Sequence, residues 1–131
     1  GSWLSASAPY INCPVEGILV LFKDRWKKDL AGKSTIQKEE FIESCGGVWK
    51  IKPETKEYTK ANFPVELPKR CINLLSYEGD LVMDPFCGGG STIVAAIETK
   101  RRYIGFEISK KGVEVANKRI APVLEQTKLV Y

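Results

Sequence analysis

Hydrophobic and polar positions in the second half of the chain follow two periods, one typical of buried strands and one typical of helices. A short apolar run at 80–83 follows a turn-like segment at 77–80 and predicts a strand. Residues 91–98 are predicted to form a helix, and its small residues would allow it to lie close against a sheet. A second strand is expected at 103–107. Ser109 is expected to cap a last helix with an apolar face made by Val113, Ala116, Ile120, Val123 and Leu124.

The first half of the chain carries shorter patterns. Residues 16–23 form a brief apolar run rich in branched side chains, and a strand is expected there. Ser34 and Gln37 have the spacing of a capping box, which predicts a helix that ends at Gly46-Gly47. A short strand is expected at 48–51.

Strands and helices therefore alternate, which is typical of an α/β fold. A polar loop at 52–62 precedes a helix expected at 64–76, since proline is tolerated in a first turn. The last strand-helix-strand unit should be parallel and right-handed. We expect one compact domain, made of a segment at 1–62 and a strand-helix-strand-helix unit at 63–131.

Composition is that of a small soluble domain. The chain has 131 residues, of which 44% are hydrophobic and 27% are charged. No run reaches the ~18 apolar residues of a membrane span, and no charged-then-apolar leader opens the chain, so a cytoplasmic protein is expected without membrane contact. The four cysteines are widely spaced and there is no histidine, which argues against a zinc site and excludes histidine-based catalysis. Reduced thiols in a cytoplasm are the expected state.

The net charge of +4 is compatible with DNA binding without requiring it. Basic residues cluster at 23–33, and Arg25, Lys27 and Lys28 are candidates for contact with DNA phosphates. A solvated loop is the competing interpretation, and the sequence leaves both open. The basic run at 100–102 lies at a helix end, where a structural role is favoured because cations suit the helix dipole.

Residues 84–92, with the sequence DPFCGGGST, place a strand end and a glycine turn directly before a helix. Gly88 and Gly90 allow positive φ angles and close approach of a ligand, so the N–H groups of the helix start would face a cofactor. Cys87 is interpreted as a residue that fills space and not as a nucleophile. The turn predicts a site for a nucleotide-containing cofactor.

Two carboxylates narrow the choice of cofactor. A dinucleotide fingerprint needs a third glycine where this chain has Ile93. Asp84 would repel a phosphate but suits an ammonium group, and Glu107, 23 residues further on, can accept both hydroxyls of a ribose. These groups fit S-adenosylmethionine, which carries a sulfonium, an amino-acid end and an unphosphorylated ribose.

The same residues resemble the cofactor-binding half of the amino-group DNA methyltransferases, which methylate N6 of adenine or N4 of cytosine. The resemblance rests on the glycine turn, on FPVELP at 63–68 and on RYIGFEI at 102–108, in the order of that family's permuted arrangement. Residues 2–23 resemble the segment between the catalytic and target-recognition parts. The resemblance implies a partial Rossmann-like methyltransferase sheet, S-adenosylmethionine as cofactor and double-stranded DNA as substrate.

The resemblance also implies roles for single residues. Asp84 would accept a hydrogen bond from the cofactor's amino group, Glu107 would bind the ribose, and Ile108 would pack on the adenine. Phe63 and Pro64 would close the pocket, with core packing as the alternative for Phe63 and Ile108. The turn would contribute backbone contacts and donors from Phe86, Cys87, Gly88, Gly90, Ser91 and Thr92.

A catalytic motif expected in this family is missing: a small polar or acidic residue followed by Pro-Pro and an aromatic, which holds the flipped base. No two of the seven prolines are adjacent, and Ala8-Pro9-Tyr10 is the nearest approach. In the permuted order the motif would precede residue 1. We therefore expect the C-terminal part of a longer or split enzyme, with an incomplete sheet that pairs with an N-terminal catalytic half or a second copy.

Three classes of function stay open on the sequence alone. The first is the cofactor-binding part of a DNA methyltransferase. The second is a module that binds S-adenosylmethionine or a subunit without chemistry, and the third is another small nucleotide-binding domain. The target base and the DNA site are not specified by the sequence.

Overall fold

The computed structural model describes residues 15–29, 31–56, 58–59 and 62–128. The contacts between residues divide the chain into two compact units, one at 1–31 and the other at 32–131. The predicted boundary after residue 62 and the single compact domain stay predictions. Ala8-Pro9-Tyr10 lies outside the described residues.

The described part of the first unit contains no helix or strand, so the strand predicted at 16–23 is wrong. Its apolar side chains, including Leu19, Leu21 and Phe22, are exposed. Phe22 instead meets Trp26 edge-on, with ring centroids 5.5 Å apart. An apolar run becomes a strand only when a neighbouring backbone pairs with it, and the described residues of this unit supply no such neighbour.

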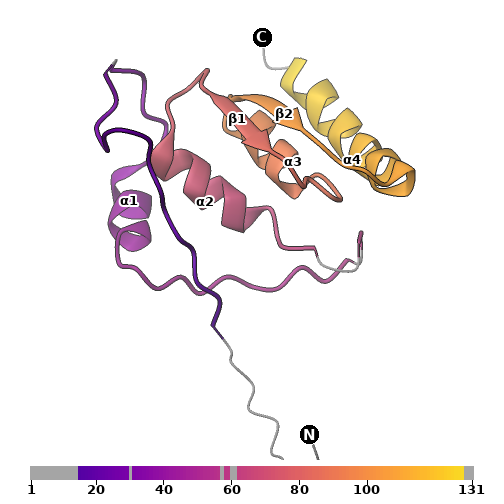
Figure 1. Ribbon diagram of the computed structural model, residues 1–131, viewed down its shortest axis with the longest axis horizontal. Coiled ribbons are helices and arrows are strands. Elements are labelled where there is room, and N and C mark those ends of the chain that lie inside the picture. Colours follow the sequence, from indigo (N-terminus) through magenta and orange to yellow (C-terminus); the bar gives the residue numbers. More distant parts are fainter. Residues whose placement is uncertain (1–14, 30, 57, 60–61, 129–131) are drawn as a thin grey trace, which may run out of the picture. The chain divides into compact units, whose positions relative to one another are not determined.

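The second unit contains four helices and two strands in its described residues (Figure 1). Their order is α1 (Lys38–Ser44), α2 (Glu66–Leu75), β1 (Leu81–Asp84), α3 (Ser91–Glu98), β2 (Arg102–Gly105) and α4 (Lys110–Lys128). β1 and β2 pair in parallel, with Leu81 opposite Arg102 and Asp84 opposite Gly105. The predicted α/β class and the predicted parallel pairing are confirmed.

The prediction for the start of α1 is wrong. The helix begins at Lys38, and its first flanking residue, Gln37, makes no side-chain cap, so the capping box is not formed. Thr35, inside the predicted box, donates its hydroxyl to Asn73 Oδ1 at 3.2 Å. The helix ends at Ser44, just before Gly46-Gly47, as predicted.

The strand predicted at 48–51 is absent, and these residues have no regular structure. The Trp49 side chain holds this segment against the helices. Its Nε1 donates to the Ser44 carbonyl at 2.8 Å, and the centre of its ring lies 5.9 Å from the Arg70 guanidinium. β2 is also shorter than predicted, so Phe106 and Glu107 follow the strand and do not belong to it.

Helix α3 is the centre of the core. Ala95 and Ala96 are fully buried, and Ile93, Val94 and Ile97 are nearly so. α2 and α4 pack against α3, and one face of the strand pair packs on it as well (Figure 1). The small residues of α3 allow this close approach, as the sequence predicts.

The opposite face of the two strands is open. Leu81 is 51% exposed, Met83 62% and Ile104 43%, whereas Val82 and Tyr103 on the other face pack against the core. Successive side chains of a strand point to opposite faces, so these exposed residues form one apolar surface. Within residues 32–128 no described element covers it.

The buried side chain of Arg101 ties the C-terminal ends of two helices together. Its guanidinium donates to the carbonyl and hydroxyl of Ser76 at 2.6 and 2.9 Å, and also to the Thr99 carbonyl and the Thr35 hydroxyl. The structural role predicted for the basic run is confirmed for Arg101. None of the described helices combines the length and the hydrophobicity that a bilayer span needs.

Candidate functional site

The glycine turn joins the end of β1 to the start of α3. Asp84 Oδ1 accepts the Phe86 N–H at 3.0 Å, and the Cys87 carbonyl accepts the Gly90 N–H at 2.7 Å. Gly88 has φ of +48° and Gly90 of +81°, so both predicted positive angles are confirmed. An added Cβ at Gly90 would lie 3.2 Å from the Ala116 Cβ, which shows how closely α4 approaches the turn.

The segment after β2 lies beside this turn. The Phe106 N–H donates to the Asp84 carbonyl, and the Cys87 N–H donates to the Phe106 carbonyl, both at 2.9 Å. Pairing therefore continues past the strands and brings the two strand ends together. Because both strands run in the same direction, Asp84 and Glu107 lie at the same edge of the sheet.

The Glu107 carboxylate is held at the start of α4. Its Oε1 accepts the Ser109 N–H at 2.7 Å. Gly112 makes room for it, since an added Cβ there would lie 2.8 Å from Glu107 Cγ. Ser109 Oγ accepts the Gly112 N–H at 3.3 Å, so the predicted cap of this helix is confirmed.

Cys87 lies within electrostatic reach of both carboxylates. Burial raises the pKa of its thiol, and the charges of Asp84 and Glu107 raise that pKa further. Its Sγ lies 3.0 Å from an added Cβ at Gly105, so the thiol occupies space that the glycine leaves free. These features agree with the interpretation of Cys87 as a residue that fills space.

We expect the Cys87 thiol to be alkylated slowly in the folded chain. A raised pKa leaves less thiolate near pH 7, and the thiolate is the reacting form. The alkylation rate should rise as the pH is raised above about 8, and unfolding in urea should abolish the protection. Iodoacetamide labelling followed by peptide mass spectrometry measures this, with the exposed Cys45 as internal comparison. Equal rates for Cys87 in the folded and unfolded chain would contradict it.

Apolar side chains stand exposed around the carboxylates. Phe86 is 87% exposed and Ile108 is fully exposed, so core packing does not account for Ile108. The Phe63 carbonyl accepts the Ser91 hydroxyl at 2.8 Å, which places the Phe-Pro segment beside the start of α3. The structure thus brings together the predicted residues of 63–64, 84–92 and 107–108.

Two further residues contact the turn, Arg119 and Tyr58, and neither is among the predicted site residues. Arg119 Nη1 donates to the Gly89 carbonyl at 2.8 Å and to Ser91 Oγ at 3.2 Å. The Arg119 guanidinium also lies 3.7 Å from the centre of the Tyr58 ring. The sequence contains one indication of the Arg119 contact. Arg119 follows Ala116 by three residues, so both side chains lie on the face of α4 that approaches the turn. The Ser91 hydroxyl is engaged with Phe63, which leaves its N–H as the donor for a ligand.

The predicted DNA contacts lie in the other unit. Arg25, Lys27 and Lys28 are exposed, and Arg25 forms an ion pair with Asp29. Both partners are largely solvated, so the pair contributes little to stability. A phosphate-binding role for these residues stays a prediction.

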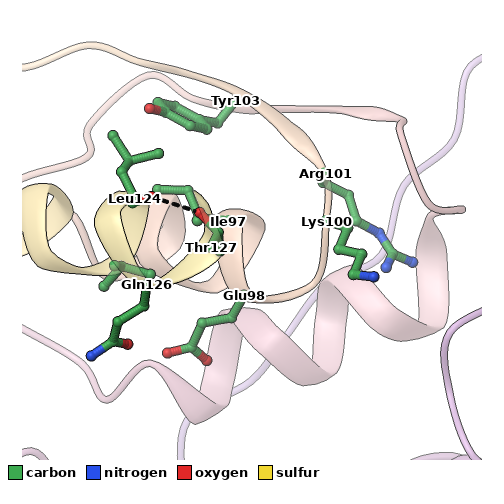
Figure 2. Close-up of a pocket in the computed structure, with 9 residues that line it drawn as sticks. Ile97, Glu98, Lys100, Arg101, Tyr103, Leu124, Gln126 and Thr127 are labelled. Carbon is green, nitrogen blue, oxygen red and sulfur yellow. Dashed lines mark hydrogen bonds between the residues drawn. The ribbon is translucent and has the colours of Figure 1, made fainter. Parts of the chain in front are cut away.

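A pocket of about 400 Å³ lies at the other end of α3, away from the glycine turn (Figure 2). Figure 2 shows Leu124 and Thr127 of α4 near the end of α3, with Tyr103 across from them. The pocket is lined by residues of α3, β2, α4 and the turn between α3 and β2. These residues are Ile97, Glu98, Lys100, Arg101, Tyr103, Val123, Leu124, Gln126 and Thr127. It contains none of the predicted site residues.

Known proteins resemble the chain in sequence and in structure. The family model for DNA methylases matches residues 2–118. The type II methyltransferase M.MjaI of Methanocaldococcus jannaschii is 35% identical over 92% of the chain, and M.BglI of Bacillus subtilis is 36% identical over 72%. TTHA0409 of Thermus thermophilus, described as a candidate DNA modification methylase and solved with S-adenosyl-L-methionine, superposes with a TM-score of 0.60 at 34% identity over 69% of the chain.

The matched region is a part of each of these proteins. The chain spans 43% of M.MjaI, 28% of M.BglI and 35% of TTHA0409. At a TM-score of 0.60, the structural match to TTHA0409 confirms the predicted partial Rossmann-like fold.

Proposed function

The chain belongs to the family of N6/N4 DNA methylases, and we propose that it is the S-adenosylmethionine-binding portion of a DNA methyltransferase. The reaction is transfer of a methyl group to the exocyclic amino group of adenine or cytosine in double-stranded DNA. The observation that carries the proposal is the meeting of Asp84, Glu107 and the glycine turn at one edge of the sheet.

The residues at this edge fit S-adenosylmethionine. The Asp84 carboxylate can accept hydrogen bonds from the amino group of the methionine end. The Glu107 carboxylate can accept hydrogen bonds from the ribose hydroxyls. The N–H groups at the start of α3 have no partner within the helix, and they suit the methionine carboxylate. Exposed Phe86 and Ile108 provide apolar surface for the adenine. TTHA0409, with 34% identity, was solved as a complex with S-adenosyl-L-methionine.

Replacing Asp84 or Glu107 by alanine is expected to weaken S-adenosylmethionine binding roughly ten- to a hundredfold. The reason is the loss of a hydrogen bond to a charged group, about 1.5–3 kcal/mol. Titration calorimetry gives the dissociation constants, and circular dichroism checks the fold.

Three further variants sharpen that test. Asp84→Asn keeps an acceptor for the Phe86 N–H, and Glu107→Gln keeps one for the Ser109 N–H, so both should retain the turn while losing the charge. Glu114→Ala removes an exposed carboxylate from α4 and serves as control. Binding equal to that of the parent in folded Asp84→Ala and Glu107→Ala would show that the pocket is misplaced.

Replacing Gly112 by alanine is expected to weaken S-adenosylmethionine binding through Glu107. The added Cβ lies 2.8 Å from Glu107 Cγ, so the Glu107 side chain must move away from its position at the start of α4. The hydrogen bond from the Ser109 N–H to Glu107 Oε1 would be lost with it, which offsets the better helix propensity of alanine, about 0.8–1.0 kcal/mol. Affinity for S-adenosylmethionine should therefore fall severalfold in a chain that circular dichroism shows to be folded. A variant that binds as tightly as the parent would contradict a role for Glu107.

We further propose that the chain methylates DNA only together with a part that carries the catalytic motif. Two observations support this: the sequence has no adjacent prolines, and the apolar face of β1 and β2 is open. An exposed apolar face with an open strand edge is suited to cover by further protein. The basic segment with Arg25, Lys27 and Lys28 would contact the phosphates of the DNA.

A further inference from the structure

Arg119 reaches from α4 onto the glycine turn, where its Nη1 donates to the Gly89 carbonyl and to the Ser91 hydroxyl. We propose that Arg119, with Tyr58 stacked on it, is a positioning residue that holds the turn in its cofactor-binding conformation. The inference rests on the proposed function, because it assigns a second layer of residues to the same site.

The peptide group between Gly89 and Gly90 is held at both ends, and Arg119 holds one of them. Its Nη1 donates to the Gly89 carbonyl at 2.8 Å, and the N–H at the other end of that peptide, from Gly90, donates to the Cys87 carbonyl at 2.7 Å. A peptide group is planar, so hydrogen bonds to both its carbonyl and its N–H restrict the rotation of the whole group. The orientation of the following N–H groups, at the start of α3, depends in turn on the orientation of this peptide group.

Three consecutive glycines need such a restraint. Glycine has more backbone freedom in the free chain than any other residue, and a turn of three would sample many conformations. A binding site that must be ordered by its ligand loses affinity in proportion to that ordering. Arg119 also donates to Ser91 Oγ at 3.2 Å, whose hydroxyl donates to the Phe63 carbonyl at 2.8 Å. One guanidinium therefore links α4, the turn and the Phe-Pro segment.

Tyr58 fixes the guanidinium itself. The Arg119 Cζ lies 3.7 Å from the centre of the Tyr58 ring, which is close stacking. The Tyr58 Cβ lies 3.1 Å from an added Cβ at Gly89, so this residue packs directly over the turn. A lysine can supply charge at position 119 but not the planar, stacked fork.

The test compares S-adenosylmethionine titrations of the 131-residue chain and its variants. Arg119→Met should weaken binding about tenfold, and Tyr58→Ala roughly two- to fivefold. Tyr58→Phe, which keeps the ring, should bind as the parent does. Lys118→Met removes the same charge from the neighbouring exposed position and is the matched control, with no loss expected.

Arg119→Lys separates geometry from charge. We expect it to remain weakened, since the fork is lost while the charge is kept. Full binding by Arg119→Lys or by Arg119→Met would overturn the proposal, as would an equal loss in Lys118→Met.

A readout without cofactor keeps this inference distinct from the proposed function. Amide hydrogen exchange over 88–91 should be faster in Arg119→Met than in Lys118→Met, with the exchange of the α3 core unchanged in both. Unchanged exchange in the turn would overturn the positioning role. If the parent chain does not bind S-adenosylmethionine, the proposed function is wrong. The exchange rates over 88–91 then still test whether Arg119 holds the turn.

Discussion

Replacing Arg101 by methionine is expected to lower the free energy of unfolding by about 3–4 kcal/mol, a large part of the stability of a small domain. The side chain is buried, with the residue 4% exposed, and its guanidinium makes hydrogen bonds to two carbonyls and two hydroxyls. Each hydrogen bond to a charged group contributes about 1.5–3 kcal/mol, and the cost of burying the guanidinium charge offsets part of that sum. Burial lowers the pKa of Arg101, and the charges of Asp80 and Glu78 oppose that effect.

Urea denaturation followed by circular dichroism measures this change. Arg102→Met is the matched control, because Arg102 is exposed and its Nε donates to the Gly79 carbonyl at 3.0 Å. The control should lose less than about 1 kcal/mol. Equal losses in the two variants would mean that the network around Arg101 does not hold the helix ends.

The isolated 131-residue chain is expected to transfer no methyl group to DNA above background. Methyl transfer needs a flipped base held by stacking and hydrogen bonds, and positioning of the two reactants contributes about 10⁵-fold or more to such reactions. The chain has no Pro-Pro-aromatic motif that would hold the base. Activity should appear when a segment with that motif, encoded with this chain, is added.

Transfer of a labelled methyl group to duplex DNA measures this activity, with complete M.MjaI as positive control. Methylation by rigorously purified chain alone would contradict the proposal. It would identify Ala8-Pro9-Tyr10 as the segment to test next.

The elements around the glycine turn could be predicted from the sequence because local patterns decide them. Small apolar residues over 91–98 specify a helix that can be buried on all sides, and Ser109 caps the following helix through Gly112. The positive φ angles of Gly88 and Gly90 follow from the residue type. The placement of Asp84 and Glu107 at one edge follows from parallel pairing.

The features that could not be predicted from the sequence depend on contacts between residues that are far apart in the chain. Thr35 lies inside the predicted capping box, yet its hydroxyl donates to Asn73 Oδ1, 38 residues away. The apolar run at 16–23 has the composition of a strand but no described partner to pair with. Arg119 reaches the turn across 30 residues, and that contact depends on how closely α4 packs on Gly90.

Calorimetric titration of the purified chain measures whether it binds S-adenosylmethionine at the glycine turn. We predict one S-adenosylmethionine bound per chain, and no measurable heat from NAD, whose pyrophosphate would meet the carboxylate of Asp84. An absence of S-adenosylmethionine binding by the folded chain, or tighter binding of NAD, would show that the glycine turn is not an S-adenosylmethionine site.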